Sequence, residues 1–226
     1  MTLALNIPDA FSIQVINLCA AVMLLLGFAM LAQRRILSLI NLFMMQGMAL
    51  FASTLIVAYT TNQSHLYWSA ALTLTLKVIA LPWILHRLIR KLSVKWDVET
   101  IINIPTTMLF GIALVVVAFN VAQPISQLSG AITRATIGIA LACTLLSFLM
   151  MITRSKAVPQ VIAFLSMENG LFFAATSATY GMPMVVELGI ALDVMVGMVI
   201  FGVFFFQIRQ QFDSLDIRQM ERIKEE

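Results

Sequence analysis

Seven apolar segments, each long enough to cross a lipid bilayer, dominate this chain of 226 residues. A membrane-spanning helix needs about 20 mostly apolar residues, and inside a bilayer every backbone polar group must be bonded within the protein. The sequence therefore predicts an all-α integral membrane protein with about seven transmembrane helices. They occupy residues 11–33, 36–60, 66–86, 104–122, 134–153, 158–180 and 183–207.

Composition excludes the soluble classes. Charged residues make up 11% of the chain and hydrophobic residues 61%, whereas an ordinary soluble domain carries about 25% charged residues. The net charge of +3 is accounted for by the connections between spans, and no nucleic-acid-binding motif accompanies it. We therefore expect a lipid bilayer as the surroundings of this chain and no nucleic-acid partner.

The positions of the positive charges predict an orientation. Cytoplasmic connections are enriched in Lys and Arg, and here alternate connections carry most of these residues. This pattern places the N-terminus outside and the C-terminus in the cytoplasm. The residues concerned are Arg34, Arg35, Arg87, Arg90, Lys91, Lys95, Arg154, Lys156, Arg209, Arg218, Arg222 and Lys224.

Three charged residues fall in the middle of predicted spans: Lys77 in the third, Glu168 in the sixth and Asp193 in the seventh. At 1.5 Å per residue, Glu168 lies roughly 20 Å and Asp193 roughly 16 Å from the outer turn, in a hydrocarbon core about 30 Å thick. Ionisable groups at that depth are costly and commonly mark ion or proton pathways.

A polar residue inside a span can instead be a structural hydrogen-bonded clasp, worth about 1 kcal/mol. We adopt that interpretation for the Ser, Thr, Asn and Gln residues of these spans. For Glu168, Asp193 and Lys77, the free-energy cost of removing the charge from water exceeds the stabilisation that a hydrogen-bonded clasp provides. We therefore predict a transport role for these three residues. On the same reasoning, Glu168→Gln should keep the fold, because it removes a buried charge.

Four further ionisable residues are possible participants. Glu187 lies closer to the outer surface, and Arg134 at the outer start of the fifth span is its natural counter-ion; a functional and a structural role are both open for this pair. His65 and His86 lie at opposite ends of the third span, roughly 30 Å apart by helix rise, so they cannot share a metal. Each is an interfacial residue that could pass protons to a pathway.

A short internal similarity adds Gln46 to the supporting residues. Residues 45–54 and 167–176 share four identities, and Gln46 stands at the position of Glu168. An internal repeat would make spans one to three and five to seven parallel copies; chance is the alternative. We find no residue pattern for a catalytic centre, a metal or another cofactor in this chain.

Several motifs resemble the component E family of hydrogenase-4. Members of this family are membrane subunits of group 4 energy-converting [NiFe] hydrogenase and formate hydrogenlyase complexes. The likeness covers most of the chain from the third span onward. The motifs are Met167-Glu168-Asn169-Gly170, the stretch from Val186 to Asp193, Trp68-Ser69-Ala70 leading to Lys77-Val78 and Pro82, and Ser214-Leu215-Asp216-Ile217.

The resemblance implies a non-catalytic, proton-conducting subunit in the inner (cytoplasmic) membrane of a prokaryotic cell. Its implied partners are antiporter-like and complex I-like membrane subunits and a soluble arm that holds the [NiFe] and iron–sulfur centres. The proposed proton pathway comprises Glu168, Asp193 and Glu187, with Lys77 acting on its nearer neighbour through its charge. A cation/proton antiporter-type transporter subunit and a purely structural membrane anchor remain as alternatives.

The last three spans, residues 134–207, also resemble the K subunit of respiratory complex I, which has three helices and two mid-membrane glutamates. Glu168 falls at the first glutamate and Asp193 at the second, although Asp193 is an aspartate and the spacing is shorter; Glu187 is an alternative. The chain is thus expected to be a single membrane domain, 1–226. It divides into four N-terminal helices (11–122), the K-like unit (134–207) and a cytoplasmic tail (208–226).

Overall fold

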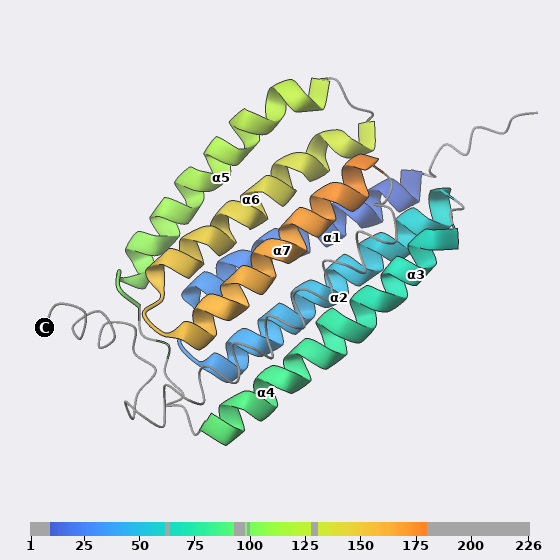
Figure 1. Ribbon diagram of the computed structural model, residues 1–226. Coiled ribbons are helices and arrows are strands. Elements are labelled where there is room, and N and C mark those ends of the chain that lie inside the picture. The colour runs from blue at the N-terminus through green and yellow to red at the C-terminus, as the bar shows by residue number, and fades with distance from the viewer. Residues whose placement is uncertain (1–9, 62–63, 93–97, 99, 128–130, 180–226) are drawn as a thin grey trace, which may run out of the picture.

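The computed structural model describes residues 10–61, 64–92, 98, 100–127 and 131–179, and these are helical apart from short connections (Figure 1). Six helical stretches are long and apolar enough to cross a membrane, and each agrees within a few residues with a predicted span. The predicted seventh span and the tail lie outside the described residues. The helices are α1 (Ala10–Ala32), α2 (Ile36–Thr61), α3 (Ser64–Thr73), the π-helix η1 (Leu74–Ala80), α4 (Leu81–Leu92), α5 (Ile104–Gln127), α6 (Ala131–Thr153) and α7 (Ala157–Thr179).

Four of these helices form the core of the bundle. Helix α1 packs against α2 and α6, and α7 packs against the same two helices. Helix α5 lies along α6 at one edge, while α3, η1 and α4 continue one another as a single span along α2 at the other edge (Figure 1). Short connections make successive spans antiparallel, so α2 and α7 run in the same direction through the bundle.

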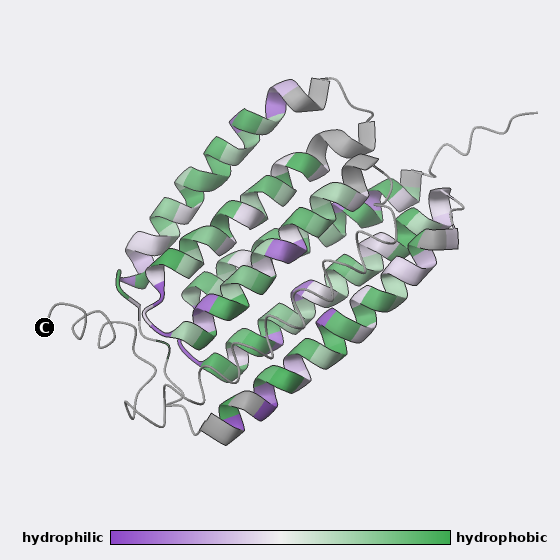
Figure 2. Cartoon of the chain, viewed as in Figure 1, coloured by the Kyte–Doolittle hydropathy of each residue, from purple (hydrophilic) through white to green (hydrophobic). Residues whose placement is uncertain are grey.

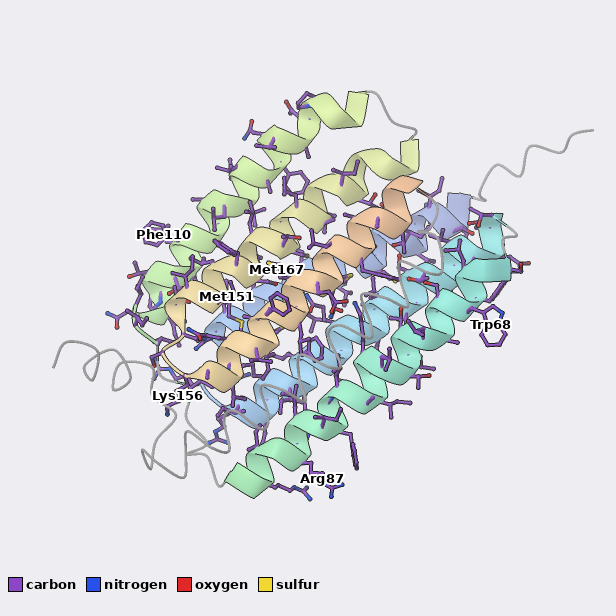
Figure 3. The ribbon with its side chains drawn as sticks, viewed as in Figure 1. Trp68, Arg87, Phe110, Met151, Lys156 and Met167 are labelled. Carbon is purple, nitrogen blue, oxygen red and sulfur yellow. The ribbon has the colours of Figure 1, made fainter. Side chains whose placement is uncertain are left out.

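The outer surface of the bundle is apolar, as a surface facing lipid must be. Figure 2 shows hydrophobic residues along most of each helix, with hydrophilic residues at helix ends and at a few positions near the middle of the bundle. Phe110 is 53% exposed and points away from the bundle from α5 (Figure 3). Trp68 and Trp83 are 67% and 60% exposed near opposite ends of the third span, positions typical of the aromatic belts at the two membrane interfaces.

Arg154, counted above among the charges of an inner connection, is only 1% exposed. Its Nη2 donates hydrogen bonds to the carbonyl oxygens of Met30 (2.9 Å) and Leu31 (2.8 Å) at the end of α1. The last carbonyls of a helix have no partner within the helix and carry partial negative charge, which a cation satisfies. Burial lowers the pKa of Arg154 to about 10, so the guanidinium keeps its charge at neutral pH.

Helices α6 and α7 approach closely at Gly170. A Cβ atom there would lie 2.8 Å from Thr144 Oγ1, 3.1 Å from Thr144 N and 3.3 Å from the Ala140 carbonyl oxygen. Small residues allow such contacts between membrane helices. A second contact, 2.8 Å between the hydroxyl oxygens of Ser147 and Ser166, is a clasp of the kind expected from the sequence.

The contact at Gly170 gives a first prediction. Gly170→Ala should lower the stability of the protein by about 1–3 kcal/mol, because backbone atoms of α6 cannot move aside for the new methyl group. The matched control is Gly27→Ala, where the nearest atom to the new Cβ is Leu146 Cδ1 at 3.5 Å, an ordinary contact. The measurement is the aggregation temperature of detergent-solubilised protein; equal values for the two variants would contradict the close approach.

Candidate functional site

A lysine and a glutamate form an ion pair in the interior of the bundle. Lys77 Nζ lies 2.8 Å from Glu168 Oε1, and the two side chains are only 7% and 12% exposed. Lys77 is near the middle of the span Leu66–Arg87, and Glu168 is near the middle of α7, one residue after Met167 (Figure 3). The ion pair therefore lies at mid-depth in the bundle and joins the third span to the sixth.

The surroundings of Lys77 compensate part of the cost of burying its charge. Removing two opposite charges from water costs several kcal/mol for each ion, and their attraction offsets this only when the geometry is good. Besides the short contact with Glu168, Nζ lies 4.9 Å from the centre of the Phe172 ring, within the range of a cation–π interaction. Phe172 lies one turn beyond Glu168 on α7, so the same helix supplies both contacts.

The π-helix η1 carries Lys77. At its end the Leu81 N–H donates to the Leu76 carbonyl, five residues earlier, where an α-helix would use the carbonyl four residues earlier. Pro82 follows and has no N–H to donate to the Val78 carbonyl, which removes one of the α-helical bonds that oppose this wider turn. Short π-helical segments are frequent at functional sites.

Helix α2 contacts this segment at Gly47. A Cβ atom on Gly47 would lie 3.3 Å from Val78 Cγ2 and 3.6 Å from the backbone carbonyl of Lys77. The preceding residue, Gln46, faces α7, where its Oε1 accepts a hydrogen bond of 3.3 Å from Asn169 Nδ2. Gln46 and Asn169 are both 0% exposed. We call Gln46, Lys77, Glu168 and Asn169 the mid-membrane polar cluster.

This cluster retains unused hydrogen-bonding capacity. Among the described residues, Gln46 Nε2, Glu168 Oε2 and Asn169 Oδ1 are buried and have no hydrogen-bond partner. Buried polar atoms in proteins nearly always have a partner, either protein or ordered water. Buried water molecules typically bond to otherwise unpaired polar atoms of this kind, so the cluster offers three bonding positions for water.

The structure brings together three of the residues singled out from the sequence: Lys77 and Glu168 are in contact, and Gln46 joins them through Asn169. His86 does not join them, because it lies nine residues beyond Lys77 on α4, with Nδ1 3.0 Å from the Pro82 carbonyl oxygen. His65 is in the first turn of α3, at the opposite end of that span.

Three other sequence predictions stay untested. Arg134 lies in the first turn of α6, and its expected counter-ion, Glu187, lies outside the described residues. Asp193 also lies outside them. Gln46 and Glu168 occupy corresponding places on two helices that pack together and run in the same direction, but the internal repeat itself would also need the seventh span.

Sequence reasoning missed three contributors to the interior. Asn169 was visible only as part of the Met-Glu-Asn-Gly motif, and nothing marked Phe172 as the aromatic contact of Lys77. Arg154 looked like an ordinary topology signal. Within the described ranges, no three residues of the types His, Cys, Asp and Glu gather in a way that could hold a metal ion.

Comparisons with known proteins include a match to hydrogenase-4 component E, the family that the motifs resemble. The chain is 28% identical to the uncharacterized protein Rv0085 of Mycobacterium tuberculosis over 216 residues, which is 95% of this chain and 98% of that protein. It is 25% identical to hydrogenase-4 component E of Escherichia coli K12 over 167 residues, which is 70% of this chain and 73% of that protein. The component E of Shigella flexneri matches to the same extent. No family model matches the chain, and no solved structure does.

Proposed function

We propose that this chain is a non-catalytic membrane subunit of a group 4 [NiFe] hydrogenase-like complex, and that its mid-membrane polar cluster takes part in proton translocation. The similarity to hydrogenase-4 component E and the apolar helical fold fit a membrane subunit of a hydrogenase complex. The observation that carries the proton role is the buried ion pair of Lys77 and Glu168.

An ion pair of this kind suits proton transfer because both partners can change their charge. A carboxylate can accept a proton and an ammonium group can release one, so the pair can exist as two ions, as two neutral groups, or with a single charge. Each change alters the electrostatic field at mid-depth, where charges are weakly screened. Asp193 and Glu187 are the proposed next acceptors along the pathway.

A purely structural role for the cluster is less favoured by the contacts. A clasp stabilises most when all its polar atoms are bonded, yet three atoms of this cluster have no partner among the described residues. An apolar pair of the same volume would often be equally or more stable than a buried ion pair. The charged residues are therefore better accounted for by a function that uses their charge.

The proposed function predicts assembly. A tagged form of this chain, solubilised gently from native membranes, should co-purify with antiporter-like and complex I-like membrane subunits and with a soluble arm that contains [NiFe] and iron–sulfur centres. Partner subunits are expected because hydrogenase-4 component E, to which the chain is similar, is by its name one component of a larger enzyme. Mass spectrometry of the eluate and hydrogen-dependent dye reduction measure this.

The control for that experiment is an unrelated multi-pass membrane protein carrying the same tag. A stable, isolated chain that exchanges cations for protons by itself in liposomes would contradict the subunit role and favour the antiporter alternative. Co-purification together with full proton coupling in a Glu168→Gln complex would instead favour the purely structural membrane anchor.

A further inference from the structure

The three spans that carry the mid-membrane polar cluster differ between their two halves in the polarity of their buried residues. One end of the bundle, here called the α2–α3 end, is where α2 and α7 finish and α3 begins. The opposite end holds Arg154 and the connection between α6 and α7. The mid-membrane polar cluster lies between these two halves, on α2, η1 and α7.

Three spans show the same asymmetry around the cluster. Each span contains at least one member of the cluster. Seven or eight residues from such a member, a buried hydroxyl residue lies toward the α2–α3 end and a buried aliphatic residue lies toward the opposite end. Counted from Gln46, Lys77 and Asn169 in turn, the hydroxyl residues are Ser53 (0% exposed), Ser69 (2%) and Thr176 (1%). The aliphatic residues at the matching distances are Leu39 (0%), Leu85 (1%) and Ile162 (0%).

On these three spans, the buried side chains of the half toward Arg154 are mainly hydrocarbon. Leu39, Leu85 and Ile162 belong to one continuous apolar cluster that also includes Ile40 and Phe43. The buried hydroxyl of Ser166 in this half is bonded to Ser147 of α6 and so is already satisfied. We call this apolar cluster the hydrophobic plug.

In the other half, Ser53 and Ser69 lack the backbone hydrogen bond that hydroxyl residues in membrane helices usually make. Such side chains commonly donate to the carbonyl oxygen four residues earlier, and Thr54 and Thr176 do so, to Leu50 and Phe172. Ser53 Oγ and Ser69 Oγ are buried and have no partner within the described ranges. They lie on two helices that pack together, α2 and α3, and Thr73 (2% exposed) lies between Ser69 and Lys77.

We propose that water reaches the Lys77–Glu168 pair from the α2–α3 end only, along a polar seam formed by Ser53, Ser69, Thr73 and Thr176, while the hydrophobic plug closes the opposite side. Hydroxyl groups spaced along neighbouring helices, two of them without a partner within the described ranges, are suitable partners for a chain of water molecules. The orientation expected from the positive charges makes the α2–α3 end the outer end. The inference rests on the proposed function for its purpose, since the seam gives the pair proton exchange with the outside.

Cysteine accessibility tests this seam in the assembled complex. Cys19 and Cys143 are first replaced by alanine, and single cysteines are then placed at Ser53 and Ser69. Membrane vesicles of each orientation are treated briefly with silver ions, a small thiol-reactive cation, with glutathione present on the opposite side. Unreacted thiols are counted afterwards, in denaturant, by the gel shift of a maleimide-coupled polymer.

The matched controls are Leu39→Cys and Leu85→Cys, which lie at the same distances from Gln46 and Lys77 on the plug side. Wet, polar surroundings favour the reactive thiolate and apolar ones suppress it, so we expect the serine positions to react from the outside about tenfold faster than either control from the cytoplasmic side. Serine to cysteine changes little in shape, and two independent positions guard against one variant that fails to assemble.

Each other outcome overturns the inference. Serine positions that react from neither side would show a dry seam, and controls that react equally fast from the cytoplasm would show an open plug. Serine positions that react only from the cytoplasmic side would show that water enters from the cytoplasm and not from the outer, α2–α3 end. Because the readout is thiol modification and not proton pumping, failure of the seam is separable from failure of the proposed function.

Discussion

Replacement of Glu168 by glutamine should reduce proton translocation by the assembled complex at least about tenfold, because a positioned proton-transferring side chain typically contributes about 10²–10⁴-fold to a proton-transfer step. Glutamine has nearly the same shape but cannot take up or release a proton. Redox turnover with an artificial acceptor should persist, because the redox centres are expected in the soluble arm. The measurement is the acidification of membrane vesicles driven by the native reaction, with subunit content checked by immunoblot.

The ion pair changes how this experiment must be controlled. From the sequence alone, Glu168→Gln removes a costly charge; in the structure it also deprives the buried Lys77 of its counter-charge. The single variant is therefore expected to lose stability as well as coupling. The double variant Lys77→Met with Glu168→Gln removes both charges and separates the two effects: its coupling should stay lost while its stability returns.

Glu168→Asp is the positive control, since it keeps a titratable carboxyl group one methylene further from Lys77. Partial coupling is expected there, which a merely structural role would not require. Normal proton translocation in a fully assembled Glu168→Gln complex would show that this carboxyl group conducts no protons and would remove the central residue of the pathway.

The second large effect is expected at Lys77. Lys77→Met alone should lower the stability of the protein by about 3–5 kcal/mol, the usual cost of leaving one partner of a buried ion pair without the other. Methionine fills a similar volume and is flexible, so the loss reflects the uncompensated carboxylate more than a cavity. The measurement is the temperature at which half of the detergent-solubilised complex aggregates.

A double-mutant cycle isolates the pairwise contribution. If Lys77 and Glu168 stabilise each other, the double variant Lys77→Met with Glu168→Gln should be more stable than Lys77→Met alone, although it carries an additional substitution. Strictly additive losses would mean that the two side chains do not interact in the assembled complex. The 2.8 Å contact would then not be a feature of the working protein.

Much of the fold could be predicted from hydropathy because it is a local property. A run of about 20 apolar residues can satisfy its backbone in a bilayer only as a helix, so the six described spans were located within a few residues. Helix rise similarly fixed the depth of Lys77 and Glu168, which needs only their positions along the chain.

The sequence could not determine which polar residues meet. It left the partner of Lys77 open, and it gave no sign that Asn169 would bond to Gln46, that η1 would widen around Lys77, or that Arg154 would be buried against α1. The reason is that these spans are mostly apolar on the sides that face lipid and on those that face other helices, and lipid tails are as apolar as leucine. Hydropathy therefore does not distinguish a face that contacts lipid from one that contacts another helix. Those pairings were decided by tertiary packing, through close approaches such as Gly170 against α6 and Gly47 against η1, which bring distant helices to the separation at which an ion pair can form.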